Sequence, residues 1–276
     1  MNFKNIQMSY MDGRPDGVRV CKMRGAPIEA VVIPRPLMGA ARKLGEEVRR
    51  HCVYFLVGRE HDNDTMLKLY VGQSKNGIER LDDHKAKKSF WEVAVMFFGD
   101  AFHFDLEIIS ALEKAAIVGA EASKRYDTTE NKIDPNYKPD VYLKDDVDRY
   151  YEIIRFFMGA FGYSLDPVDN IGPGQWHTKR NGIVAYGNRT PNGFEVLPGS
   201  QIDMASEKIQ QSYLKLRQAL LKSKDIETCS DGKYILRKVV TFNTPSGASD
   251  FVIGNATNGW LEWINDKGEP LDILRK

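Results

Sequence analysis

Two short apolar runs separated by a polar segment constrain the fold of this chain more than any other feature. The runs are Cys52–Val57 and Leu67–Val71, and both are of strand length and rich in β-branched and aromatic residues. The segment between them, GREHDNDT, is polar. We therefore expect an antiparallel hairpin with a long loop.

The sequence that follows the second run predicts two helices and a third strand. Residues 77–88 have helical character, and residues 90–98 form another apolar run that ends at Gly99. Residues 105–125 carry apolar side chains at helical spacing, which predicts one helix with a buried stripe. The fold class is therefore expected to be α+β, with a small, mainly antiparallel central sheet flanked by helices.

Composition shifts divide the chain into four expected parts. Residues 1–48 form a lead-in with strands and a helix at 37–50, and residues 49–139 form the first domain, which ends in a polar, proline-containing stretch. Residues 140–181 are expected to be a helical connector and a Gly/Pro-rich linker. Residues 182–276 are expected to be a small α+β C-terminal module. In that module we expect strands at 182–186, 193–197 and 234–241, helices at 207–222 and 246–254, and a strand or turn at 259–263.

Composition excludes several classes of protein. The chain of 276 residues is 42% hydrophobic and 28% charged, which fits a globular protein with a real core, and its net charge is only +1. No apolar run is long enough for a membrane span, and the N-terminus lacks the apolar stretch of a signal peptide. The three cysteines have no zinc-site spacing, so a reduced, cytoplasmic protein without membrane association is expected.

Five polar side chains occupy positions where a plain core would not need them. Tyr54 and Tyr70 lie in the two expected strands, and Arg80 and His84 share one face of the helix that follows. Glu113 points along the apolar stripe of the long helix, where an unpaired carboxylate is costly. A pocket with these groups would suit phosphodiester hydrolysis, because a carboxylate can hold a divalent cation and arginine matches phosphate.

Each of these residues also has a structural interpretation. The tyrosines could be strand aromatics with a hydrogen-bonded hydroxyl, and Arg80 and His84 could form a solvated helix face. Glu113 could pair with Lys85 or Arg125. The run Lys85, Lys87 and Lys88 could contact a phosphate backbone or simply face solvent.

The ordered segments CVYFLVG, LYVGQSKNGIERLDDH, ISALEKAAIVGAEA and TENKIDP resemble a nuclease domain of the GIY-YIG superfamily. The resemblance covers about 85 residues. The first motif reads Cys52-Val53-Tyr54, so the tyrosine is kept and cysteine replaces the glycine. The matching positions, in order, are Tyr54, Tyr70, Arg80, His84 (found in a restriction-enzyme-like subset), Glu113 and Asn131.

The resemblance implies a catalytic role for each of these six residues. Tyr54 would be the general base, assisted by Tyr70 or His84, and Glu113 would bind one Mg²⁺ or Mn²⁺ ion. Arg80 would neutralise charge on the phosphate, and Asn131 would hold the site together by hydrogen bonds. Lys85, Lys87 and Lys88 would bind nucleic acid.

The C-terminal part resembles a second family. The segments GFEVLPGSQI, SYLKLRQAL, TFNTPSGASDFVIGNATNGWLEW and LDILR are similar to a domain of unknown function, DUF4357-like, that is often fused to such nucleases. Residues 207–238 carry eight Lys/Arg against four Asp/Glu. Trp260 and Trp263 could stack on a base or pack in the core. The module is therefore expected to bind duplex DNA.

The expected function is metal-dependent endonuclease activity on DNA, with restriction or phage defence as the setting by analogy. An RNA-cleaving, toxin-like nuclease and a non-catalytic DNA-binding protein with a relic site remain alternatives. A homodimer is compatible with this function, because many site-specific nucleases pair to cut two strands.

Overall fold

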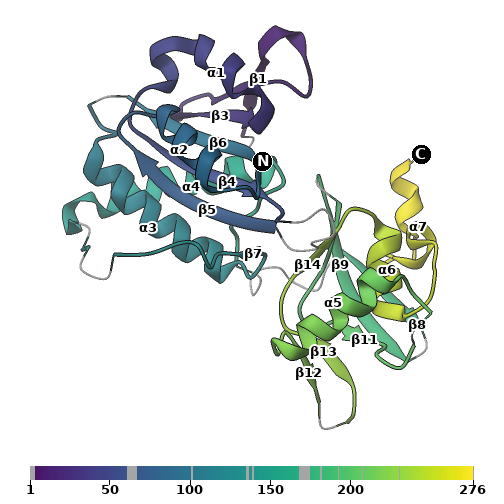
Figure 1. Cartoon of the computed structure of the whole chain (residues 1–276). Helices are drawn as coiled ribbons and strands as arrows, with labels where there is room; N and C mark the ends of the chain where they lie inside the picture. Colours follow the sequence, from purple (N-terminus) through teal and green to yellow (C-terminus); the bar gives the residue numbers. More distant parts are fainter. Residues whose placement is uncertain are drawn as a thin grey trace. The chain divides into compact units, whose positions relative to one another are not determined.

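The computed structural model of the chain divides into two compact units (Figure 1). The first unit comprises Met1–Ala122 and Tyr126–Leu165, and the second comprises Ser123–Arg125 and Asp166–Lys276. The structure describes residues 4–60, 67–100, 102–134, 137–138, 140–167, 175–180, 182–191, 193–206, 208–229 and 231–275. The fold class is α+β, as predicted.

The first unit is built on one seven-stranded sheet within the described residues, with strand order β1-β2-β3-β6-β4-β5-β7. All neighbours pair antiparallel except β5 and β7, which are parallel. The strands are β1 (Ile6–Tyr10), β2 (Arg19–Met23), β3 (Ile28–Pro34), β4 (Cys52–Gly58), β5 (Leu67–Ser74), β6 (Trp91–Gly99) and β7 (Tyr126–Asp127). The expected hairpin is confirmed as β4 and β5, although residues 61–66 of its loop lie outside the described part of the chain.

Helices cover both faces of this sheet, as the alternation of the central strand β4 requires. Val53 and Phe55 of β4 pack on the core shared with α3 (Leu106–Ala122) and α4 (Lys144–Ala160). Tyr54 and Leu56 face the opposite core, which includes residues of α1 (Met38–Ala41) and α2 (Glu79–Lys87). All seven residues of β4 are buried, which explains its uninterrupted apolar sequence.

Two features of the N-terminal stretch differ from the expected lead-in. Its strands β1, β2 and β3 belong to the central sheet, because β3 pairs with β6 over seven residues. The helix expected at 37–50 is wrong as a continuous element, since α1 is flanked by 3₁₀ helices at Arg35–Leu37 and Arg42–Val48. Gly45 has a φ of 65° inside the second of these, which no regular helix accommodates.

The second unit contains two small sheets and three helices among its described residues. The sheets have strand orders β14-β10-β9-β8 and β11-β13-β12. The elements are β8 (Trp176–Arg180), β9 (Ile183–Thr190), β10 (Gly193–Val196), β11 (Gln201–Ile202), α5 (Gln211–Lys222), β12 (Ile226–Thr228), β13 (Tyr234–Leu236), β14 (Val240–Phe242), α6 (Pro245–Ile253), α7 (Gly259–Glu262) and a 3₁₀ helix at Leu271–Arg275.

Three local expectations for this unit were wrong. The strand predicted at 234–241 is two strands, β13 and β14, which belong to different sheets. The strand or turn predicted at 259–263 begins as the short helix α7, in which the Asn258 side chain accepts a hydrogen bond from the Trp260 N–H. Part of the expected linker, Trp176–Arg180, is strand β8, whereas residues 168–174 lie outside the described residues.

No helix in the described part of the chain is long and apolar enough to cross a membrane.

Gly72 is required by the packing of Tyr54, because the two residues are directly opposed in the β4–β5 pair. A Cβ atom at position 72 would overlap the Tyr54 hydroxyl and the ring carbon that bears it. We predict that Gly72→Ala destabilises the first unit by ~1–3 kcal/mol, the usual cost of overpacking a core, measured by chemical denaturation. Gly39→Ala is the matched control, since its added methyl group meets no atom within 4 Å.

The same substitution should lose most of its effect when Tyr54 is also replaced by alanine, because the overlapping ring is then absent. An equal cost of Gly72→Ala in the presence and absence of the Tyr54 ring would show that backbone propensity, and not this contact, selects glycine.

Candidate active site

Tyr54 and His84 form the centre of the candidate site. The Tyr54 hydroxyl lies 2.7 Å from His84 Nε2 in a hydrogen bond, and both residues are buried, with 1% and 5% of their surface exposed. His84 is placed there by α2, where Leu81 is the other buried residue. The interpretation of His84 as part of a solvated helix face is therefore wrong.

Tyr70 completes an aromatic cluster with these two residues. Its ring centre lies 5.1 Å from that of His84 and 6.3 Å from that of Tyr54. Tyr54 on β4 and Tyr70 on β5 point to the same face of the sheet, since both pack on the core that contains α2. The two hydroxyl groups thus come from neighbouring strands.

Arg80 extends from the start of α2 beside this cluster. Its guanidinium forms an ion pair with Asp83 at 3.0 Å and remains 46% exposed. Its positive charge lowers the pKa of Glu113 and of Tyr70, so it lies within electrostatic reach of both. Arg80 also donates a side-chain hydrogen bond to the Tyr54 hydroxyl. Its partly exposed guanidinium can exchange the weak surface ion pair with Asp83 for a phosphate group.

Glu113 reaches the outer edge of β5 from α3. Asp105 caps this helix by accepting hydrogen bonds from the Glu107 and Ile108 N–H groups. The half-buried Glu113 carboxylate accepts a hydrogen bond from the backbone N–H of Gln73. Neither Lys85 nor Arg125 forms an ion pair with it: Lys85 is exposed, and Arg125 pairs with Glu195 at 3.1 Å within the second unit.

Asn131 holds the same strand edge a few residues away. Its Oδ1 accepts a hydrogen bond from Val71 N at 2.8 Å, and its Nδ2 donates to Leu69 O at 2.8 Å. The side chain therefore pairs with β5 as a neighbouring strand would. It positions the strand that carries Tyr70 and does not point a free group at the cluster.

Burial sets the ionisation of this site. It raises the pKa of Glu113 to about 7, and it raises the pKa of Tyr54 and Tyr70 above the usual range. For His84, burial first and the charges of Arg80 and Lys88 second lower the pKa to about 4. Near neutral pH, His84 is therefore an uncharged imidazole that can accept a proton.

The three lysines expected to bind nucleic acid have different environments. Lys85 and Lys87 are exposed on α2. Lys88 is half-buried, pairs with Glu130, and places its Nζ 4.2 Å from the centre of the Tyr70 ring. Lys88 thus acts as a structural neighbour of Tyr70. Sequence reasoning did not identify Glu130, because it lies in a loop without periodicity.

The chemistry of the site fits a divalent cation at Glu113. The carboxylate is half-buried, has no ion pair in the described part of the chain, and lies close enough to Tyr70 to raise the pKa of its hydroxyl. Mg²⁺ is commonly held by one or two carboxylates together with waters and substrate phosphates. No group of three or more His, Cys, Asp or Glu side chains that could hold a metal is found among the described residues.

Half of the eight cationic residues counted in the C-terminal module are neutralised or buried. Arg217 is buried and donates to the carbonyls of Phe251 and Ser206. Three others form ion pairs, namely Lys233 with Asp231, Arg237 with Glu227, and Lys238 with Asp225. The remaining four are exposed lysines without an ion pair among the described residues: Lys208, Lys215, Lys222 and Lys224.

The two tryptophans of this module do not offer a free aromatic face. Trp263 is fully buried and donates from Nε1 to Pro245 O at 3.0 Å. Trp260 is half-buried, and the Arg275 guanidinium lies 3.7 Å from the centre of its ring. Packing in the core is confirmed for Trp263.

The raised pKa of Glu113 gives a prediction about stability. Its folded pKa of about 7 lies above the unfolded value, so the folded state holds the proton more tightly and loses stability as pH rises through 7. Glu113→Gln keeps an acceptor for Gln73 but has no charge. In EDTA, it should match wild type at pH 5 and exceed it by ~1–2 kcal/mol at pH 8, after allowance for solvent screening.

Denaturant unfolding at both pH values measures this difference. Glu121→Gln on the same helix is the matched control, because Glu121 is exposed, and it should show no pH-dependent gain. A Glu113→Gln variant that is less stable than wild type at pH 8 would contradict the prediction.

Comparison with known proteins identifies only the C-terminal part. Residues 176–275 match the family model described as a domain of unknown function (DUF4357). Neither a curated protein nor a solved structure matches the chain. The second unit thus carries a DUF4357 domain, as its sequence segments predicted.

Proposed function

We propose that the first unit is a metal-dependent endonuclease that hydrolyses phosphodiester bonds in DNA, and that the second unit binds the duplex. The observation that carries the proposal is the buried Tyr54–His84 hydrogen bond beside Tyr70, Arg80 and Glu113. It combines a proton acceptor, a phosphate-matching cation and a carboxylate in one place. This combination is what the resemblance to GIY-YIG nucleases implies for these residues.

The Tyr54–His84 pair can move a proton away from an attacking water. We assign the Tyr54 hydroxyl as the donor, which requires the tautomer of neutral His84 with its proton on Nδ1. As the water oxygen bonds to phosphorus, its proton passes to the Tyr54 oxygen, and the Tyr54 proton passes to His84 Nε2. The bond from phosphorus to the 3′ oxygen breaks, and that oxygen leaves.

The substrate itself improves this relay. In the resting site, the Arg80 charge is one of the causes that lower the pKa of His84. A phosphodiester bound to Arg80 neutralises that charge, so the pKa of His84 rises toward the range useful for a base. Arg80 also binds the phosphate through paired N–H groups, which orients it for in-line attack.

Glu113 is the residue that would hold Mg²⁺ or Mn²⁺. When bound, the ion supplies Lewis-acid stabilisation of the charge that develops on the phosphate and the leaving oxygen. Asn131 and the Lys88–Glu130 pair keep β5 and the Tyr70 ring in position. These residues act through Tyr70 and do not touch the substrate.

Plasmid cleavage tests this function. With Mg²⁺ or Mn²⁺, wild type should nick or cut supercoiled DNA, and EDTA should stop the reaction. Glu113→Gln should lose activity by at least ~10²-fold, whereas Glu121→Gln should keep it. His84→Gln should slow the reaction by ~10²-fold, because the proton relay loses its acceptor.

Full activity of Glu113→Gln would overturn the proposed site. Cleavage of RNA and not of DNA by wild type would assign the same chemistry to the alternative substrate.

The exposed lysines on and beside α5 are the groups that support DNA binding by the second unit. Lys215 and Lys222 are seven residues apart on α5 and therefore share one face. Exposed lysines without acidic partners can replace condensed cations on a phosphate backbone. The paired cations Lys233 and Arg237 would have to give up a carboxylate before they could do so.

Two double substitutions compare how much the unpaired lysines and the ion-paired cations contribute to DNA binding. We predict that Lys215→Gln/Lys222→Gln weakens binding of the full chain to duplex DNA and reduces the slope of log K against log salt by ~2. The control Lys233→Gln/Arg237→Gln removes the same charge and should change the slope by less than half as much. Fluorescence anisotropy at several salt concentrations measures both. Equal effects of the two variants would argue against a binding face on α5.

A further inference from the structure

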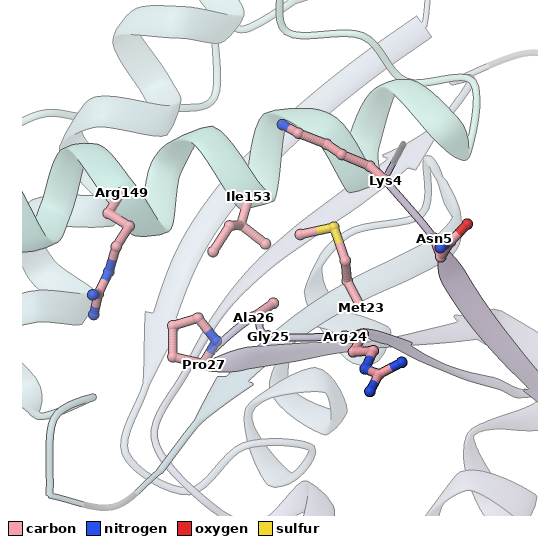
Figure 2. Close-up of a pocket in the computed structure, with 9 residues that line it drawn as sticks. All are labelled: Lys4, Asn5, Met23, Arg24, Gly25, Ala26, Pro27, Arg149 and Ile153. Carbon is pink, nitrogen blue, oxygen red and sulfur yellow. The ribbon is translucent and has the colours of Figure 1, made fainter. Parts of the chain in front are cut away.

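A second candidate binding site lies on the first unit at the other side of its sheet. A cavity of ≈ 470 Å³ opens between β1, the turn after β2 and α4 (Figure 2). Tyr54 and Tyr70 lie on β4 and β5, which are separated from β2 by β3 and β6 in the strand order. The cavity is therefore distinct from the candidate active site. Its lining residues are Lys4, Asn5, Met23, Arg24, Gly25, Ala26, Pro27, Arg149 and Ile153.

The rim of this cavity is cationic. Lys4, Arg24 and Arg149 come from three separate segments, and no acidic residue lines the cavity. In Figure 2 the charged ends of Arg149 and Lys4 lie on two sides of the apolar residues, and the Arg24 guanidinium extends outward from the turn. Arg24 has no ion pair among the described residues, and Lys4 lies over the Phe156 ring at 4.9 Å from its centre. Among the described residues, only Arg149 of these three cations is ion-paired, with Asp146 at 3.6 Å, and its guanidinium also hydrogen-bonds the Tyr150 side chain.

Apolar side chains line the part of the cavity between these cations. Figure 2 shows Met23, Ile153 and Pro27 there. The turn that carries Arg24 is held by a hydrogen bond from Ala26 N to Met23 O at 3.0 Å, and Gly25 supplies its left-handed residue with a φ of 81°. The turn thus places a cation and an apolar surface side by side.

We propose that this cavity binds a nucleoside phosphate. Its volume lies within the range of small-molecule sites and can hold a mononucleotide. A phosphate monoester carries about two negative charges, which matches a rim of three cations with a single acidic neighbour. Guanidinium groups bind phosphate through paired N–H donors and also stack on flat rings. Met23, Ile153 and Pro27 would contact the base.

The ligand could be a free nucleotide or the 5′-phosphorylated end of a nucleic acid, because both present the same group. Calorimetric titration of the full chain in EDTA distinguishes them, with AMP, adenosine, inorganic phosphate, and an oligonucleotide with or without a 5′ phosphate as probes. We expect AMP to bind with a Kd of about 0.1 mM and adenosine at least tenfold more weakly. Tighter binding of the 5′-phosphorylated oligonucleotide than of AMP would identify the strand end as the source.

Substitutions of the lining residues test whether AMP binds in this cavity. Arg24→Ala/Arg149→Ala should weaken AMP binding at least tenfold, and Ala26→Glu should abolish it by placing a carboxylate in the cavity. Arg14→Ala is the control, because Arg14 is an exposed arginine outside the cavity, and it should bind as wild type does. Glu113→Gln should also bind normally, so a failure of the proposed nuclease site would not affect this test. Thermal unfolding checks that each variant is folded.

Three results would overturn the proposal. One is no binding of either AMP or the phosphorylated oligonucleotide at millimolar concentration. Another is equal binding by wild type and by the folded Arg24→Ala/Arg149→Ala variant. The third is inorganic phosphate binding as tightly as AMP, which would show that the nucleoside does not contribute to binding.

Discussion

The first unit depends on how the backbone N–H and C=O groups along the outer edge of β5 find hydrogen-bond partners. An edge strand has backbone groups that need partners, and β7 supplies them only at Leu67 and Lys68. Beyond that point, the Asn131 side chain donates a hydrogen bond to Leu69 O and accepts one from Val71 N. The Glu113 carboxylate accepts a hydrogen bond from Gln73 N. Two side chains thus continue the hydrogen bonding that a further strand would provide. The same contacts fix the strand that carries Tyr70.

This arrangement gives the candidate site an unusual charge balance. Burial keeps Tyr54 and Tyr70 protonated and His84 neutral, and it holds Glu113 near the midpoint of its titration at pH 7. The positive charge of Lys88 is offset by Glu130. Arg80, which hydrogen-bonds the Tyr54 hydroxyl and pairs with the exposed Asp83, therefore brings the main positive charge to the cluster. An anionic group that binds to Arg80 changes the ionisation of every other member.

Local sequence patterns predicted the elements that surround this site. The alternation and length of the apolar runs gave β4, β5 and β6, and helical spacing gave α2 and α3. The residue types at Tyr54, Tyr70, Arg80, His84 and Glu113 predicted that they share one environment, and the pKa shift of each of them has another member of the cluster among its causes.

Long-range pairings could not be predicted in the same way. The pairing of β3 with β6 joins residues about 60 to 70 positions apart, and nothing in either strand specifies the other. Glu113 was expected to point inward. Its hydrogen bond with the Gln73 backbone, however, depends on where β7 ends along the edge of β5. The break at Gly45 reflects one left-handed residue, which composition alone cannot distinguish from an ordinary helical glycine.

In the second unit, contacts within the fold account for a recognisable sequence segment. The polar residues of the stretch from Thr244 to Trp263 are used within the fold: Thr244 caps α6, Asp250 accepts from Thr257, and Asn258 caps α7. Gly259 packs so closely on the Pro245 backbone that a side chain would not fit. These contacts account for an unusual sequence without any ligand. The proposed DNA binding therefore rests on the exposed lysines on and beside α5, which have no ion pair among the described residues, and not on this segment.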